Sequence, residues 1–178
     1  MQQPVQTQMP IYDEESVQPM RDELIAYGFD EARTPEELDR VLSPEIKGTT
    51  LVFVNSVCGC AAGSARPGVG AALQHSIIPD RFVTVFAGQD RDAVDRLRQH
   101  YLSEYPPSSP SIALFQDGEV VHMMHRSMIE GRSPMQVAEH LMQVFDKLCH
   151  RQGPSIAPEQ FEQIVQAVFC GSSIPLNR

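Results

Sequence analysis

The chain has 178 residues, of which 42% are hydrophobic and 21% charged, so its size suits one globular domain with tails better than two independent domains. Its 14 basic and 23 acidic residues give a formal net charge of −9, which argues against a nucleic-acid partner, because neutralising phosphates requires clustered Lys and Arg. The sequence has no basic-then-apolar opening and no apolar run of the ~18–20 residues that span a bilayer, so we expect a cytoplasmic protein without a membrane partner.

The first third of the chain predicts a tail, two helices and a buried strand. Residues 1–12 are rich in Gln and Pro and have little to bury, so we expect a flexible tail. Apolar residues at helical spacing predict a helix over about 13–27, and the capping-box pattern at 34–37 predicts the start of a second helix. The apolar run 49–55 predicts a buried strand.

Helices and strands alternate in the rest of the chain. In order, the patterns predict a helix over 61–74 that kinks near Pro67, a strand over 82–86, and an amphipathic helix over 90–102. A β-hairpin over 111–116 and 119–124 follows. A second capping box at 133–136 predicts the start of a helix that runs through Cys149, and a last helix is predicted over 158–169. We therefore expect an α/β domain over 13–150, with a central mixed sheet of about four strands flanked by helices. Extra helical segments are expected at both ends, the second within a C-terminal extension over 151–178.

Two cysteines flank a single glycine directly after the first predicted strand, as Cys58-Gly59-Cys60. Open α/β sheets usually carry their chemistry at this place, beyond the carboxyl end of a strand. A metal site is disfavoured because no second cysteine pair stands at zinc-knuckle spacing. Two inert core cysteines are disfavoured because the glycine between them adds no side-chain volume.

A redox pair is the favoured interpretation of these two cysteines. The start of a helix stabilises a thiolate, so Cys58, which is nearer the helix start, is predicted to attack a disulfide. Cys60 is then predicted to resolve the mixed intermediate. A disulfide between them would close a very small ring, in which Gly59 relieves part of the steric problem.

Five other polar or sulfur-containing residues lie near the predicted thiols or in the later elements. Asn55 and Ser56 are expected to position the loop by side-chain hydrogen bonds. Arg66 either stabilises a thiolate, binds a carboxylate, or lies on a solvated helix face. Cys149 is expected to be a buried helix-end thiol, with a third redox role as the alternative, and Cys170 a tail cysteine without chemistry.

His122, Met124 and His125 resemble metal ligands on a strand. Alternation places His122 and Met124 on one face and His125 on the other, which is poor geometry for a shared metal ion. We therefore predict partly exposed sheet residues and no metal site.

Several segments of the sequence resemble the bacilliredoxin family. They are VNSVCGCAAG at 54–63, ARP at 65–67, VTVFAGQD at 83–90, PSSPS at 107–111, and VVH at 120–122 with a closing EG, in the family's order and with similar spacing over about 13–149. The resemblance implies a thioredoxin-like fold and the removal of bacillithiol from mixed disulfides on proteins, with weak disulfide-isomerase behaviour. It also implies that Cys58 is the nucleophilic cysteine and Cys60 the second redox cysteine.

The resemblance further implies a cis-proline at Pro110, beside the cysteines, where the backbone at Ser109 and Pro110 would pair with a substrate segment. We therefore expect a cofactor-free thiol–disulfide oxidoreductase, with Ser109, Pro110 and Gly59 in substrate binding. Its expected partners are S-thiolated (bacillithiolated) proteins, the low-molecular-weight thiol, and a regenerating thiol or reductase. Two alternatives stay open: a protein disulfide isomerase at the same site, and a non-enzymatic metal- or iron–sulfur-binding protein that uses Cys58, Cys60 and Cys149.

Overall fold

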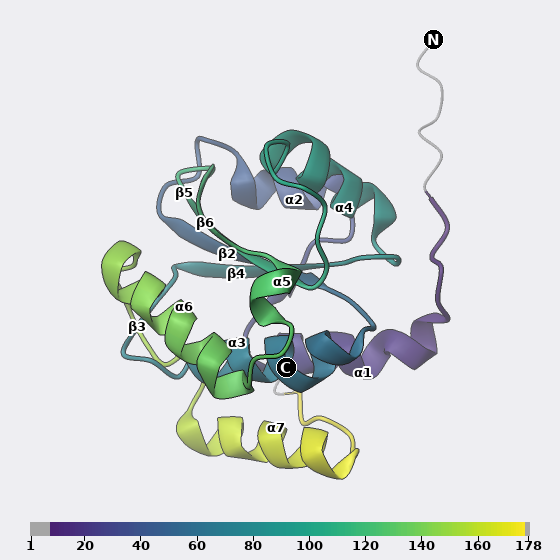
Figure 1. Cartoon of the computed structure of the whole chain (residues 1–178), viewed down its shortest axis with the longest axis vertical. Helices are drawn as coiled ribbons and strands as arrows, with labels where there is room; N and C mark the ends of the chain where they lie inside the picture. The colour runs from purple at the N-terminus through teal and green to yellow at the C-terminus, as the bar shows by residue number, and fades with distance from the viewer. Residues whose placement is uncertain (1–7, 177–178) are drawn as a thin grey trace.

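A five-stranded mixed β-sheet lies at the centre of the computed structural model, which describes residues 8–176 (Figure 1). In sheet order the strands are β1 (Asp30–Glu31), β4 (Arg81–Phe86), β2 (Thr49–Asn55), β5 (Ser111–Gln116) and β6 (Glu119–Met124). β1 and β2 run parallel to β4, whereas β5 is antiparallel to both β2 and β6. A parallel β–α–β unit followed by an antiparallel hairpin and a helix is the thioredoxin-like arrangement, so the predicted fold class is confirmed.

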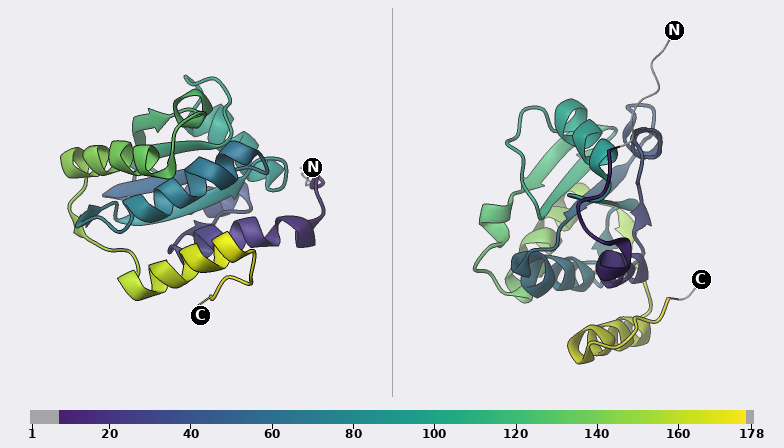
Figure 2. Two further views of the ribbon diagram at one scale, coloured as in Figure 1. Left: turned by 60° about the horizontal axis from the view of Figure 1, so that its bottom comes forward. Right: turned by 90° about the vertical axis from the view of Figure 1, so that its right-hand side faces the viewer.

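Helices cover both faces of this sheet. On one face lie α2 (Pro35–Leu42) and α4 (Arg91–Arg96), which continues as the π-helical turn η2 (Leu97–Tyr101), and on the other lie α1 (Glu14–Ala26), α3 (Arg66–Ala72) and α6 (Pro134–Leu148) (Figure 1). The short α5 (Arg126–Ile129) follows β6, and α7 (Pro158–Cys170) packs outside α1 as an additional layer (Figure 2). A separate two-stranded sheet pairs β3 (Ile77–Ile78) with β7 (Arg151–Gln152).

The alternation of side chains along β2 divides the core into two parts. Leu51 and Phe53 pack with α1, α3 and α6, whereas Val52 and Val54 pack with α2 and α4. All seven residues of β2 are buried, as expected for a central strand covered on both faces. This rigid strand carries the segment that bears Cys58 at its carboxyl end.

Local sequence signals predicted most element boundaries. Both capping boxes form: Thr34 with Glu37 opens α2, and Ser133 with Gln136 opens α6. The two hairpin strands end at the predicted residues, and Asp117 and Gly118 both take positive φ in the turn between them.

The structure corrects the sequence prediction in three places. The central sheet has five strands and not about four, because the two-residue β1 is too short to show a periodic pattern. β3 and β7 were missed for the same reason. The helix after the cysteines departs from α-helical hydrogen bonding before Pro67, in the π-helical segment η1 (Ala61–Ala65), where the Arg66 N–H donates to the Ala61 carbonyl.

Both ends of the described chain contact the domain. Residues 1–7 of the predicted tail lie outside the described residues, whereas the Ile11 N–H donates to the Gly88 carbonyl at 2.8 Å. In the C-terminal extension the Ser155 hydroxyl donates to the Tyr27 carbonyl at 2.8 Å, and the Phe161 and Tyr27 rings lie 6.0 Å apart. Within residues 8–176, none of the helices combines the length and the apolar character needed to cross a bilayer.

Candidate active site

The two redox-candidate cysteines lie in the turn between β2 and the helix that follows it. This helix begins at Gly59 and continues through η1 into α3. The Cys58 carbonyl accepts hydrogen bonds from the N–H groups of Ala61 and Ala62, at 3.1 and 3.3 Å, so Cys58 stands at the N-cap position. The Cys58 thiol therefore lies at the positive end of a helix, as predicted.

The two thiols are close together and differ in acidity. Both are free and partly exposed, and their sulfur atoms lie 2.7 Å apart. Burial opposes ionisation of Cys58, but hydrogen bonds from Cys60, from Ser56 and from the Ala61 and Cys60 N–H groups outweigh it and lower the pKa of the Cys58 thiol. Burial and then the neighbouring Cys58 raise the pKa of the Cys60 thiol. The arrangement favours one thiolate, on Cys58, with a protonated thiol beside it.

Asn55 and Ser56 hold the turn, as the sequence predicted. The Ser56 hydroxyl donates to Cys58 Sγ at 3.2 Å and lies 3.4 Å from the Cys58 N–H. Asn55 Oδ1 accepts from the Ser56 N–H at 2.9 Å, and Asn55 Nδ2 donates to the Met20 carbonyl at 3.1 Å. The turn is therefore fixed both to itself and to α1.

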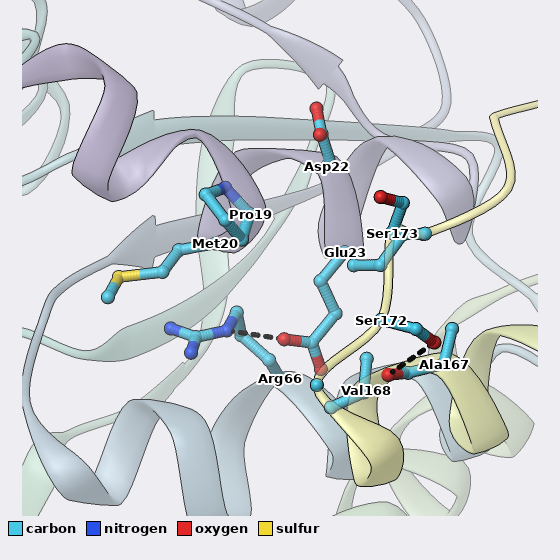
Figure 3. Close-up of a pocket in the computed structure, with 11 residues that line it drawn as sticks. Pro19, Met20, Asp22, Glu23, Arg66, Ala167, Val168, Ser172 and Ser173 are labelled. Carbon is cyan, nitrogen blue, oxygen red and sulfur yellow. Dashed lines mark hydrogen bonds and ion pairs between the residues drawn. The ribbon is translucent and has the colours of Figure 1, made fainter.

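Arg66 is buried and does not lie on a solvated helix face. Its Nε donates to Glu23 Oε2 at 2.7 Å (Figure 3). Its Nη1 donates to Asn55 Oδ1 at 3.1 Å and to the Ser56 carbonyl at 3.2 Å. The solvated interpretation was wrong because Glu23, 43 residues away in the sequence, neutralises the guanidinium inside the fold. Burial raises the pKa of Glu23, although the ion pair with Arg66 opposes that rise.

A pocket of about 380 Å³ lies on the far side of this ion pair (Figure 3). α1 contributes Pro19, Met20 and Glu23 to its wall, and the C-terminal extension contributes Val168 and Ser172. Arg66 also lines this pocket, whereas neither Cys58 nor Cys60 does. The C-terminal extension therefore lies beside the buried ion pair of Arg66 and Glu23.

The Ser109–Pro110 peptide bond is cis, and it lies at the same end of the sheet as the thiols. β5 begins at Ser111, which pairs with Val54 near the end of β2. This places the loop before β5 beside the turn that bears Cys58. The assignment of Ser109, Pro110 and Gly59 to substrate binding stays a prediction, and for Gly59 the structure shows open space, because a Cβ there would have no heavy atom within 4 Å.

Arg126 is a residue of this edge that the sequence prediction missed. Its N–H donates to Ser108 Oγ at 2.8 Å, and its guanidinium is close enough to lower the pKa of Cys60 by charge, against the larger effect of burial. No local pattern marks it, because its position depends on α5 folding back across the loop that precedes β5. A hollow at this edge is lined by Ser109, His125 and Arg126, among other residues.

Cys149 lies far from the other two cysteines. It packs beside Thr49, at the start of β2, and burial raises the pKa of its thiol to about 11. Because the seven-residue strand β2 spans roughly 20 Å, Cys149 cannot share a metal ion with Cys58 and Cys60. The described residues contain no group of three or more His, Cys, Asp and Glu side chains placed to hold a metal ion.

Of the three residues predicted to lie on one strand, His122 and Met124 belong to β6, whereas His125 follows the strand as the N-cap of α5. His122 Nε2 lies 2.9 Å from His140 Nε2 of α6, and the His125 ring lies 5.8 Å from that of Tyr105. Met124 was predicted to be partly exposed but is completely buried, because β6 ends under α6 and the residues after it.

Comparison with known proteins gives matches over the part of the chain that forms this site. The family model described as disulphide isomerase matches residues 12–149. A bacilliredoxin of Cytophaga hutchinsonii is 49% identical over 138 residues, covering 78% of this chain and 100% of the relative. A bacilliredoxin of Geobacillus kaustophilus is 51% identical over 139 residues, covering 78% and 94%. The solved structure of oxidised thioredoxin from Plasmodium falciparum is 14% identical, with a TM-score of 0.41 over 66% of this chain and 99% of that one.

Proposed function

Because the chain belongs to the bacilliredoxin family, we propose that this thiol–disulfide oxidoreductase removes bacillithiol, or a similar low-molecular-weight thiol, from mixed disulfides on proteins. The observation that supports this most directly is the contrast between the two thiols. Cys58 has a lowered pKa and is partly exposed, and its sulfur lies 2.7 Å from that of Cys60, whose pKa is raised. The proposed compartment is the cytoplasm, where such cysteines stay reduced.

The first proposed step is attack by the Cys58 thiolate on the small-thiol sulfur of a protein mixed disulfide. A new disulfide forms between Cys58 and the small thiol, the sulfur–sulfur bond of the mixed disulfide breaks, and the protein cysteine leaves as a thiolate that takes a proton from solvent. The N–H groups at the helix start and the Ser56 hydroxyl stabilise the attacking thiolate. The proposed substrate contact is backbone pairing at Ser109 and Pro110, on the neighbouring loop.

The second proposed step releases the small thiol. Cys60 loses its proton and attacks Cys58 Sγ, so that a Cys58–Cys60 disulfide forms and the small thiol leaves in its reduced form. A regenerating thiol or reductase then supplies two electrons and two protons. Alternatively, a second small thiol attacks the small-thiol sulfur of the disulfide on Cys58. The two small thiols then leave as a disulfide, and Cys58 returns to its reduced form.

The test presents one protein substrate as a mixed disulfide with bacillithiol and, in parallel, with glutathione. Cys60→Ala should accumulate the small thiol on Cys58, visible by intact mass. Cys58→Ala should trap nothing and should slow release of the small thiol by at least about 100-fold, because the nucleophile is gone. Release by Cys58→Ala at the wild-type rate would refute the assignment of the nucleophile, and equal rates with both thiols would refute a preference for bacillithiol.

A second candidate function is protein disulfide isomerisation, which the description of the matching family model favours. The site is the same, but the substrate is a disulfide between two protein cysteines. Reactivation of scrambled ribonuclease separates the two functions. If that reaction is faster than release of a small thiol under matched concentrations, isomerisation is the main activity.

A further inference from the structure

Two fully buried charges lie behind the candidate active site and make no direct contact with either thiol. Arg66 of α3 is 4% exposed and Glu23 of α1 is 3% exposed. Burying an ion pair is costly unless geometry and hydrogen bonds compensate for the lost hydration. Here the Nε–Oε2 distance is 2.7 Å, and the Tyr27 hydroxyl lies 3.5 Å from the other carboxylate oxygen (Figure 3 shows the ion pair).

The guanidinium also reaches the end of β2. Arg66 Nη1 donates both to Asn55 Oδ1, at 3.1 Å, and to the Ser56 carbonyl, at 3.2 Å. Asn55 Oδ1 accepts at the same time from the Ser56 N–H, at 2.9 Å. Two of the polar groups that define the position of Ser56, the Asn55 amide oxygen and the Ser56 carbonyl, therefore accept from one buried cation.

Ser56 connects the hydrogen bonds of Arg66 to the Cys58 thiol. Its hydroxyl donates to Cys58 Sγ at 3.2 Å, and this hydrogen bond is one of those that favour the thiolate. A hydroxyl stabilises an anion only if it is held at the correct distance and angle. The hydrogen bonds from Arg66 hold the backbone of the residue that supplies this hydroxyl.

We propose that Arg66, held by Glu23, is a positioning residue for the Cys58 thiolate and acts through Asn55 and Ser56. Arg66 does not touch the substrate, and its role is independent of which disulfide the enzyme attacks. Arg126 of α5, on the exposed side of the site, acts on the thiols by its charge. Arg66 holds the turn by hydrogen bonds from the buried side, whereas Arg126 faces solvent.

The test measures ionisation of Cys58 without any disulfide substrate. The rate of alkylation of Cys58 by iodoacetamide is followed by peptide mass spectrometry from pH 4 to pH 10, in the full chain. Arg66→Met should move the midpoint of this profile upward by about one pH unit, which lowers the rate below the midpoint by about tenfold. Ser56→Ala should also raise the midpoint, because it removes the final hydrogen bond.

The combination of the two substitutions distinguishes positioning from a general charge effect. If Arg66 acts through Ser56, Arg66→Met adds little to the shift that Ser56→Ala already causes. Fully additive shifts, or an unchanged midpoint in Arg66→Met, would overturn the proposal. Should Arg66→Met fail to fold, Arg66→Lys replaces it: lysine keeps the charge but cannot reproduce the forked hydrogen bonds, so the midpoint should still rise, and an unchanged midpoint overturns the proposal.

Arg21 provides a matched control on α1. It is 2% exposed and forms another buried ion pair, with Asp90, at 2.8 Å, but it makes no hydrogen bond to Asn55 or Ser56 among the described residues. Arg21→Met should destabilise the protein and leave the Cys58 midpoint unchanged. An equal shift in this control would show that any loss of a buried ion pair produces the effect. Because iodoacetamide is the only reagent, this result does not depend on the proposed small-thiol substrate.

Discussion

The four cysteines differ in their surroundings far more than in their sequence context. Cys58 is partly exposed at a helix start, and hydrogen bonds there lower its pKa in spite of burial. Cys149 is 3% exposed, and burial raises the pKa of its thiol to about 11. Cys170 is exposed on the last turn of α7. Because the thiolate is the reactive form, exposure and pKa together determine which cysteine reacts.

Limiting iodoacetamide at pH 7 should therefore modify Cys58 first and Cys149 last. Peptide mass spectrometry of timed samples gives the order. In denaturing urea the difference between Cys58 and Cys149 should largely disappear, because both thiols then return to ordinary acidity. Labelling of Cys149 in the native protein at the rate of Cys58 would contradict the environments described here.

At the scale of single residues, the sequence predicts interactions between residues that are close together in the chain. It does not predict interactions between residues that are far apart in the chain. The two cysteines stand one residue apart after an apolar run, so their pairing is visible in the sequence. The hydrogen-bonding role of Asn55 and Ser56 was also predictable, because it is local. The ion pair between Arg66 and Glu23 was not, because it depends on α1 and α3 packing side by side.

At the scale of elements, Gly153 determines how the C-terminal extension leaves the domain. Its N–H donates to the Ser76 carbonyl at 2.8 Å, next to the pairing of β3 with β7. A Cβ at this position would collide with the His75 carbonyl oxygen. Only glycine allows the two backbones to approach this closely.

Gly153→Ala should destabilise the protein by about 1–3 kcal/mol and lower its melting temperature by roughly 3–10 °C, because backbone atoms must move to make room. Thermal unfolding followed by circular dichroism measures the change. Gly63→Ala is the matched control, since a Cβ at Gly63 has no heavy atom within 4 Å. That control should be neutral or stabilising by up to about 1 kcal/mol, as alanine favours a helix.

Elements were predictable where their signals lie within a few residues. The capping boxes at Thr34 and Ser133 mark helix starts by interactions three residues apart, and the Asp117-Gly118 turn sets the hairpin. β1, β3 and β7 have two residues each and exist only through pairing with distant strands. No periodic pattern can form over two residues, so these strands follow from the tertiary structure alone.

At the scale of the whole molecule, a histidine pair joins the edge strand β6 to α6. His122 and His140 are half-buried, with 2.9 Å between their Nε2 atoms. Burial and then the charge of His140 lower the pKa of His122, and burial and then Arg132 lower that of His140. A lowered pKa means that the folded state favours the neutral rings more than the unfolded state does. The stability from this pair is therefore complete above the ordinary histidine pKa of about 6.5 and is lost as the pH falls.

The melting temperature should accordingly decrease between pH 7 and pH 5, before most carboxylates titrate. His140→Gln removes the second titrating ring, so the decrease over this range should become smaller. Differential scanning calorimetry in a series of buffers measures the melting temperature at each pH. His150 is exposed, so His150→Gln is the control and should keep the wild-type dependence of the melting temperature on pH. The same pH dependence in His140→Gln as in the wild type would exclude the pair as its origin.

The open space around Gly59 has a consequence for protein engineering. A Cβ at this position between the two thiols would meet no heavy atom of the described residues within 4 Å, so a methyl group can be added there without a clash. Substituting small side chains at this one position would therefore vary the flexibility of the link between Cys58 and Cys60. Such a set would be a starting point for thiol biosensors with graded response.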